Sequence, residues 1–149
     1  MTTFSELGLS ELSVQALTRK GFEEPTPIQI KTIPAVLTGD SDIVAQAQTG
    51  TGKTAAFGLP LLEMLDPDIR TVQALVLAPT RELAIQVAEE INSMRGGRTI
   101  NVAPIYGGQS MEIQLRSLKK GVSVVVGTPG RVLDHLRRGS LNLSGIRFL

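Results

Sequence analysis

Short apolar runs alternate with helical patterns along the 149-residue chain, and this alternation limits the possible folds more than any other feature. Residues 74–78 are apolar at every position, which predicts a strand that is buried on both faces. Apolar residues then recur at helical spacing: Leu83, Val87, Ile91 and Met94. Buried strands that alternate with amphipathic helices predict an α/β fold with three layers, in which helices cover both faces of a parallel sheet.

The rest of the chain continues this alternation. Further strands are expected at residues 42–45, 101–106 and 122–126, and another begins at 147–149. Helices are expected at residues 10–20, 27–37 and 53–65, and around two apolar stripes formed by Met111, Leu115 and Leu118 and by Val132, Leu133 and Leu136. The first helix should bury one face that contains Leu9, Leu12, Ala16 and Leu17.

The composition excludes several classes of site. Cysteine is absent and His135 is the single histidine, so disulfides, thiolate zinc sites, cysteine nucleophiles and histidine metal clusters are excluded. His135 lies in a polar stretch of its expected helix, and we assign it no role. The chain begins without a secretory signal, and no apolar run approaches the roughly 20 residues that span a bilayer. We therefore expect a cytoplasmic protein without a membrane partner.

Charge is unevenly distributed although the formal net charge is only +1. Residues 1–75 carry 5 Lys or Arg against 9 Asp or Glu, whereas residues 76–149 carry 10 against 5. A basic second half favours a polyanionic partner for that half. A charged face can equally be a solvated face, so the charge by itself leaves both interpretations open.

A glycine-rich segment, A-Q-T-G-T-G-K-T, joins an expected strand to an expected helix. It fits the phosphate-loop pattern G-x-x-x-x-G-K-[ST], except that Ala47 replaces the first glycine. Gly50 and Gly52 permit a backbone that turns N–H groups toward phosphate oxygens at a helix N-terminus. Lys53 would reach the β- and γ-phosphates, and the Thr54 hydroxyl would bind Mg²⁺. We predict a nucleotide site at this segment.

Five landmarks resemble the motifs of DEAD-box ATP-dependent RNA helicases and occur in that family's order. They are G-F-E-E-P-T-P-I-Q with Phe4 upstream (Q motif), A-Q-T-G-T-G-K-T (motif I), P-T-R-E-L-A (motif Ia), G-G, and T-P-G-R (motif Ib). The resemblance implies an incomplete RecA-like P-loop NTPase lobe, the N-terminal part of the first lobe. Residues 1–40 would form the Q-motif region, and residues 41–149 would carry the P-loop and the RNA-contact motifs. Complete members of the family unwind short RNA duplexes or remodel ribonucleoproteins.

The resemblance implies a site for ATP and Mg²⁺ built from the first two motifs, with Lys53 and Thr54 as catalytic residues. Gln29 would read the adenine edge, because a terminal amide offers a donor beside an acceptor. Phe4 would pack on the adenine ring, and Thr26 would support the loop. The phosphates and Mg²⁺ would be bound by Thr49, Gly50, Thr51, Gly52, Lys53 and Thr54. Taken alone, Gln29 is more simply a polar position on an amphipathic helix.

The other three landmarks are expected at helix starts along one edge of the sheet. Helix N-termini bind anions, so a row of them suits the phosphate backbone of single-stranded RNA with little sequence preference. The resemblance implies RNA contacts from Pro79, Thr80, Arg81, Gly107, Gly108, Gln109, Thr128, Pro129, Gly130 and Arg131. Taken singly, Thr80 and Thr128 are ordinary helix caps, and Arg81 is a candidate to pair with an acidic neighbour.

The sequence stops where the family continues into D-E-A-D, and it lacks the S-A-T motif and the second RecA-like lobe. Phosphoryl transfer needs those parts, so we expect this chain alone to bind nucleotide without hydrolysis or unwinding. We also expect apolar strand edges to be exposed. Two alternatives stay open. One is a catalytically silent, truncated nucleotide- and RNA-binding module. The other is a different P-loop ATPase, such as a DNA helicase or transporter subunit, which leaves Gln29 and T-P-G-R unexplained.

Overall fold

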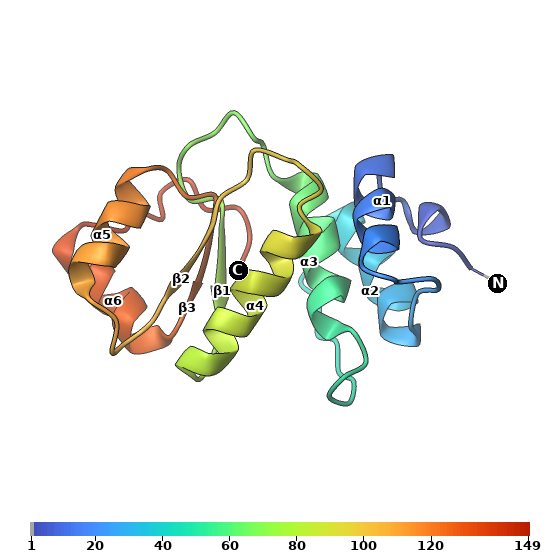
Figure 1. Ribbon diagram of the computed structural model, residues 1–149, viewed down its shortest axis with the longest axis horizontal. Coiled ribbons are helices and arrows are strands. Elements are labelled where there is room, and N and C mark those ends of the chain that lie inside the picture. The colour runs from blue at the N-terminus through green and yellow to red at the C-terminus, as the bar shows by residue number, and fades with distance from the viewer. Residues whose placement is uncertain (1) are drawn as a thin grey trace. The chain divides into compact units, whose positions relative to one another are not determined.

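The computed structural model describes residues 2–149, which group into two compact units. Unit 1 comprises Met1–Leu65 and Ser93–Arg98, and unit 2 comprises Asp66–Asn92 and Thr99–Leu149. Unit 1 is helical, whereas unit 2 contains the sheet (Figure 1). Within the described residues, no helix is long and apolar enough to cross a membrane.

Unit 2 is built on a parallel sheet of three strands in the order β1-β3-β2. β1 (Ala74–Leu77) and β2 (Val102–Ile105) both pair with the central strand, β3 (Val124–Gly127). Every residue of β3 is buried, as expected for a strand that has a neighbour on each side and a helix layer on each face. A parallel bridge between Ala74 and Phe148 marks the beginning of the expected last strand beside β1.

Helices cover both faces of this sheet, which gives unit 2 its three layers (Figure 1). α4 (Arg81–Met94) connects β1 to β2, and α5 (Met111–Lys119) connects β2 back to β3. The two crossovers run in opposite directions along the sheet, so right-handed connections place their helices on opposite faces. α6 (Pro129–Arg138) follows β3 and lies on the same side as α5. The three-layer α/β fold predicted from the sequence is confirmed.

An aliphatic core fills the space between the sheet and the layer of α5 and α6. Leu118 and Leu136 pack onto it from those two helices. Its buried members are Val72, Leu75, Ala103, Ile105, Val122, Val125, Val132 and Leu141. Full burial of one such side chain contributes about 1.5–3 kcal/mol, so this core fixes the helices and the loops that precede them.

Unit 1 contains a short 3-10 helix, η1 (Ser5–Leu7), and three α-helices: α1 (Glu11–Arg19), α2 (Pro27–Thr38) and α3 (Lys53–Met64). α2 and α3 pack against each other. Most of α3 is buried, which its small and apolar residues permit: Ala55, Ala56, Gly58, Leu59, Pro60, Leu61 and Leu62. The three helices expected in this part of the chain are therefore present.

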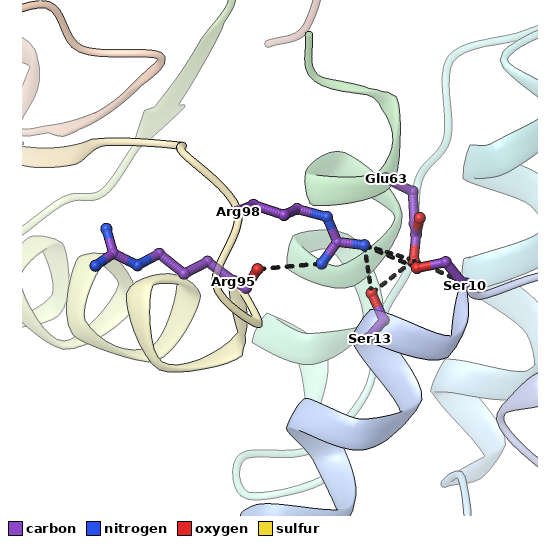
Figure 2. A network of polar contacts seen from close by, with 5 residues as sticks. All are labelled: Ser10, Ser13, Glu63, Arg95 and Arg98. Carbon is purple, nitrogen blue, oxygen red and sulfur yellow. Dashed lines mark hydrogen bonds and ion pairs between the residues drawn. The ribbon is translucent and has the colours of Figure 1, made fainter. Parts of the chain in front are cut away.

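A largely buried ion pair joins three parts of unit 1 (Figure 2). Arg98 Nη2 lies 3.0 Å from Glu63 Oε1, and the two side chains are only 12% and 15% exposed. The same carboxylate oxygen accepts hydrogen bonds from the backbone N–H and the hydroxyl of Ser10 and from the hydroxyl of Ser13. Arg98 also donates to the carbonyl of Arg95. One carboxylate thus holds the start of α1, the end of α3 and the turn after α4.

The strand expected at residues 42–45 does not form. Residues 41–46 are exposed, and Val44 is fully exposed at 101%. An apolar run becomes a buried strand only when another strand supplies its hydrogen-bond partners. Among the described residues, the three strands pair with one another and none pairs with this segment.

The apolar face expected for the first helix is only partly correct. Leu9, Ala16 and Leu17 are buried, but Leu12 is 49% exposed. Ser13 is buried instead, because its hydroxyl donates to Glu63 at 2.6 Å. Hydrogen bonding to an internal carboxylate therefore allows a serine to be buried in α1 while a leucine one position earlier is exposed.

We expect Glu63→Gln to lower the free energy of unfolding by roughly 3 kcal/mol at pH 7, because it leaves Arg98 largely buried without a counter-charge. Burial alone would raise the pKa of Glu63, but the bonds from Ser13 and Ser10 and the charge of Arg98 hold that pKa below its ordinary value of 4.5. The carboxylate therefore stabilises the protein above about pH 4.5, and this stabilisation is lost as pH falls through the lowered pKa. Urea denaturation as a function of pH measures both effects.

Glu112→Gln is the matched control, since Glu112 forms an exposed ion pair with Arg116. Exposed pairs of this kind contribute little to stability, so the control should leave the unfolding midpoint unchanged. Equal losses for the two variants would contradict a stabilising role of the buried carboxylate.

Candidate nucleotide and nucleic-acid sites

The glycine-rich segment of unit 1 forms the turn that begins α3. Gly52 caps the helix with φ +81°, and the helix starts at Lys53. No side chain caps this N-terminus, and no acidic residue occupies its first turn. The first backbone N–H groups therefore remain as donors at the positive end of the helix dipole. This set of donors fits an anion such as phosphate.

Two side chains close this loop on itself. The Lys53 ammonium donates to the carbonyl of Ala47 at 2.7 Å, and the Thr51 hydroxyl donates to the carbonyl of Gln48 at 2.6 Å. Phosphate oxygens at the start of α3 would offer Lys53 a charged acceptor in place of a neutral one, and such hydrogen bonds are roughly twice as strong. The hydrogen bond to Ala47 thus holds Lys53 near the start of α3, where an anion could replace that carbonyl as its acceptor.

The Q-motif residues contact the phosphate loop directly. Gln29 is fully buried, and its Oε1 accepts the backbone N–H of Thr26 at 3.0 Å as part of a capping box at the start of α2. Its Nε2 donates to the carbonyl of Gly52 at 3.2 Å. The hydroxyl of Thr26 donates to the carbonyl of Thr51 at 2.8 Å. The amide of Gln29 keeps one N–H and one lone pair for a further partner.

The remaining residues predicted for nucleotide binding lie apart from these contacts. Thr49 and Gly50 are exposed, and Gly50 has φ +80° with open space around it. Phe4 is only 4% exposed and caps η1, so its ring is buried in unit 1. Stacking of Phe4 on adenine stays a prediction.

The loop offers one candidate oxygen for Mg²⁺. Thr54 is half-buried in the first turn of α3, and a hydroxyl oxygen is a hard ligand of the kind that Mg²⁺ accepts. Across residues 2–149, no group of three His, Asp or Glu side chains could hold a metal ion. The Thr54 hydroxyl could therefore supply one oxygen ligand to a Mg²⁺ ion.

The residues predicted to contact RNA gather at one edge of unit 2. Parallel pairing aligns Leu77 and Ile105 with Gly127, so the three strands end at the same level. α4, α5 and α6 each begin a few residues beyond their strand. Three helix N-termini therefore lie along the carboxyl edge of the sheet, where open α/β sheets bind ligands.

Of the three helix starts, that of α6 has the fewest capping bonds and acidic residues to offset its positive end. Thr128 occupies the cap position without a side-chain capping bond, Pro129 follows it, and the first turn contains no acidic residue. By contrast, the Thr80 hydroxyl accepts the N–H of Leu83 at the start of α4, whose first turn contains Glu82. The N-terminus that follows the central strand is thus the one most open to an external anion.

Arg81 lies against the backbone of the loop that contains Gly107 and Gly108. A Cβ on Gly108, which has φ +88°, would lie 3.0 Å from Arg81 Nη1. Arg81 Nε also lies 2.9 Å from Glu82 Oε1. The prediction that this arginine pairs with an acidic neighbour is therefore confirmed. Both side chains are more than half exposed, and such a pair is weak enough to yield to a phosphate.

Arg131 holds the other side of the same loop. Its Nη1 donates to the carbonyl of Gln109 at 3.0 Å and to Oε1 of Gln114 at 3.2 Å. A guanidinium has five N–H donors, so donors remain for a phosphate. The structure thus brings the T-P-G-R segment and the two glycines into one assembly at the edge of the sheet.

His135 and Gln114 support this assembly, although the sequence did not single them out. His135 is fully buried rather than part of a polar surface, with Nε2 at 2.9 Å from Gln114 Oε1 and Nδ1 at 2.7 Å from the hydroxyl of Ser140. Burial and the charge of Arg131 lower the pKa of His135 below its ordinary value of 6.5, so the ring is neutral at pH 7. The burial of His135 could have been predicted from its spacing of three residues from Val132, because this spacing places both residues on one face of the helix.

The prediction for Leu133 was also wrong. It was expected in the apolar stripe of this helix, but it is 49% exposed. The buried face of α6 instead contains Val132 and His135, because the histidine finds hydrogen-bond partners inside.

Comparison with known proteins identifies relatives of the whole chain. A sequence profile described as DEAD/DEAH box helicase matches residues 26–149. The DEAD-box ATP-dependent RNA helicase CshA of Geobacillus kaustophilus is 57% identical over 146 residues, which are 98% of this chain and 31% of the relative. The ATP-dependent RNA helicase DeaD of Klebsiella pneumoniae is 56% identical over 144 residues, 96% of this chain and 22% of the relative. The chain thus spans less than a third of the length of these relatives.

Solved structures share the fold at high similarity. A DEAD box protein from the hyperthermophile Methanococcus jannaschii matches with a TM-score of 0.93 and 49% identity, over 99% of this chain and 40% of that one. Dbp5 of S. cerevisiae, in a structure bound to RNA and ADP BeF3, matches with a TM-score of 0.87 and 35% identity, over 99% of this chain and 37% of that one. These similarities establish a RecA-like fold.

We expect Gly52→Ala to lower the free energy of unfolding by about 3 kcal/mol. A Cβ at this position would lie 2.3 Å from Gln29 Nε2, and φ is +81°. Gly50→Ala is the matched control, since it imposes the same backbone strain in open space and should cost only about 1 kcal/mol. In a Gln29→Ala background the extra cost at position 52 should shrink, because the clashing group is gone. Equal costs at positions 50 and 52, measured by urea denaturation, would show that the contact with Gln29 is unimportant.

Proposed function

Because the chain belongs to the DEAD/DEAH box helicase family, we propose that it forms the N-terminal part of the first RecA-like lobe of an ATP-dependent RNA helicase. Residues 1–40 would be the Q-motif region, and residues 41–149 would carry the P-loop and the RNA-contact motifs. The complete protein would act in the cytoplasm, close a second RecA-like lobe over ATP and RNA, and unwind short duplexes or remodel ribonucleoproteins.

The observation that carries the RNA part of this proposal is the row of three helix N-termini at the carboxyl edge of unit 2. Positive helix ends, exposed glycine backbone and the guanidinium groups of Arg81 and Arg131 are all suited to phosphate oxygens. Tyr106 is the single aromatic residue in the loops at this edge, so stacking on bases would contribute little. Binding through the backbone implies little preference for base sequence.

The nucleotide part of the proposal is supported by the contacts of unit 1. ATP would supply the phosphoryl group to be transferred and, through its phosphate oxygens, most of the ligands of Mg²⁺. Lys53 would neutralise the β- and γ-phosphates, and Thr54 would bind the metal. Thr26 and Gln29 would keep the loop in the conformation that presents these groups, because both already bond to its carbonyls.

A catalytically silent module that binds nucleotide or RNA is the second candidate function. It would use the same groups to bind its ligands, namely the N-terminus of α3 and the row of helix N-termini in unit 2. RNA-stimulated ATP hydrolysis separates the two candidates. A longer protein that contains this chain should hydrolyse ATP faster when RNA is present, whereas a silent module would bind its ligands without turnover.

We expect Gln29→Ala to weaken binding of both ATP and ADP by roughly tenfold without unfolding the chain, since it removes hydrogen bonds to Gly52 and Thr26 and the group proposed to read adenine. Fluorescence titration with a labelled adenine nucleotide measures the affinity. Gln15→Ala is the control, because Gln15 is an exposed glutamine whose bond to Glu11 lies within α1. Unchanged nucleotide affinity in Gln29→Ala would refute the assignment.

We expect Arg131→Ala to lower the affinity for single-stranded RNA by roughly tenfold, the effect of losing about 1.5 kcal/mol from a charge-assisted hydrogen bond. The loss should be similar for unrelated RNA sequences, as measured by fluorescence anisotropy. Arg138→Ala removes the same charge from the other end of α6, where Arg138 pairs with Asp134, and should have a much smaller effect. A loss that depends on the RNA sequence would contradict backbone recognition.

A further inference from the structure

A buried hydrogen-bond network lies directly behind the edge proposed to bind RNA. Its centre is the side chain of Gln114, which is 1% exposed. Nε2 of Gln114 donates to the carbonyl of Tyr106 at 2.8 Å and to Oε1 of Gln109 at 3.0 Å. Oε1 of Gln114 accepts from Arg131 Nη1 at 3.2 Å and lies 2.9 Å from His135 Nε2. Both N–H groups and both lone pairs of this amide are therefore used.

The chemistry of these partners fixes the orientation of both side chains. The carbonyl of Tyr106 only accepts, so the nitrogen of the Gln114 amide must face it and the amide oxygen must face His135. The imidazole therefore carries its proton on Nε2 and donates it to Gln114. In the neutral ring, Nδ1 accepts the hydroxyl of Ser140, 2.7 Å away, and the same hydroxyl also lies 3.2 Å from the carbonyl of His135. The proton arrangement is therefore fixed at the Gln114 end of the network.

This network connects three segments that are far apart in the sequence. Tyr106 and Gln109 flank the two glycines of the loop after β2, Gln114 belongs to α5, and Arg131 and His135 belong to α6. The glycines have no side chains that could hold the loop. Its conformation therefore depends on the bonds that Gln114 and Arg131 make at its two ends.

We propose that Gln114 and His135 are positioning residues for RNA binding, which hold the glycine loop and the Arg131 guanidinium together as one preorganised anion site. This inference rests on the proposed function of the edge. Both side chains are buried, so they would act through the loop and through Arg131 rather than by touching RNA. Each bond that orders the loop before binding reduces the conformational-entropy cost of binding RNA.

A purely structural role is the competing explanation, because removing any buried amide destabilises a protein. Gln73 provides the matched control. It is a fully buried glutamine of the same unit, bonded to the backbone of Asp66 and Ile69, and it lies just before β1, at the opposite end of that strand from the RNA edge. Gln114→Met and Gln73→Met remove the same amide and keep a similar volume.

RNA affinity and thermal stability of these variants, in the full chain, test the proposal. Both substitutions should lower the melting temperature, but only Gln114→Met should weaken RNA binding, by about as much as Arg131→Ala. The double variant Gln114→Met with Arg131→Ala should bind RNA no more weakly than Arg131→Ala alone, because both changes disrupt one unit. His135→Gln keeps an N–H donor near the position of Nε2 and should retain most of the affinity that His135→Leu loses.

Equal RNA affinities of Gln114→Met and Gln73→Met, or additive losses in the double variant, would overturn the proposal. Should Gln114→Met fail to fold, the comparison of His135→Gln with His135→Leu tests the same network with a smaller change. Should the unsubstituted chain bind no RNA, the proposed function fails, and hydrogen exchange then tests the positioning separately. Amides of residues 107–110 should exchange at least tenfold faster in Gln114→Met and remain unchanged in Gln73→Met. Unchanged exchange in both would refute the positioning role.

Discussion

Parallel pairing of β3 with a strand on each side is the constraint on which the rest of unit 2 depends. It aligns the ends of three strands at Gly127, and each connection then leads into a helix whose N-terminus opens at the same edge. At Gly127 a Cβ would lie 2.3 Å from Val132 Cγ2 and 3.1 Å from the carbonyl of Ile105, so any larger residue would require a shift there. The absence of a side chain at this position thus permits the close packing of α6 on β3.

In unit 1 the corresponding constraint is a set of hydrogen bonds to backbone carbonyls. Thr26 and Gln29 bond to the phosphate loop, and Gln29 also closes the capping box of its own helix. A single amide thus couples the start of α2 to the start of α3. The two units share one feature, since in each a buried glutamine donates a hydrogen bond to a backbone carbonyl at a glycine-containing loop.

Much of this arrangement could be predicted because it depends on local patterns. The buried strands, the amphipathic helices and the glycine-rich turn are each encoded within a few consecutive residues. The exposed segment that contains Val44 could not be predicted, because its burial depends on a partner strand and not on its own apolar residues. His135, Gln114 and Ser13 were missed for a related reason. A polar residue is buried only where partners from distant segments satisfy it, and no local pattern in the sequence reveals those partners.

The three aligned helix starts have a thermodynamic consequence for the protein itself. Their dipoles point the same way, so the folded state places three positive helix ends near one another, whereas the unfolded chain has no such ends. Glu82 and Glu112 partly offset the repulsion between these positive ends at α4 and α5, whereas the first turn of α6 contains no acidic residue. A polyanion that occupies the edge relieves this repulsion only in the folded state. By mass action it would add about 2.7 kcal/mol to the free energy of unfolding at 100 times its dissociation constant. A nucleic acid bound at this edge would then also stabilise the folded state.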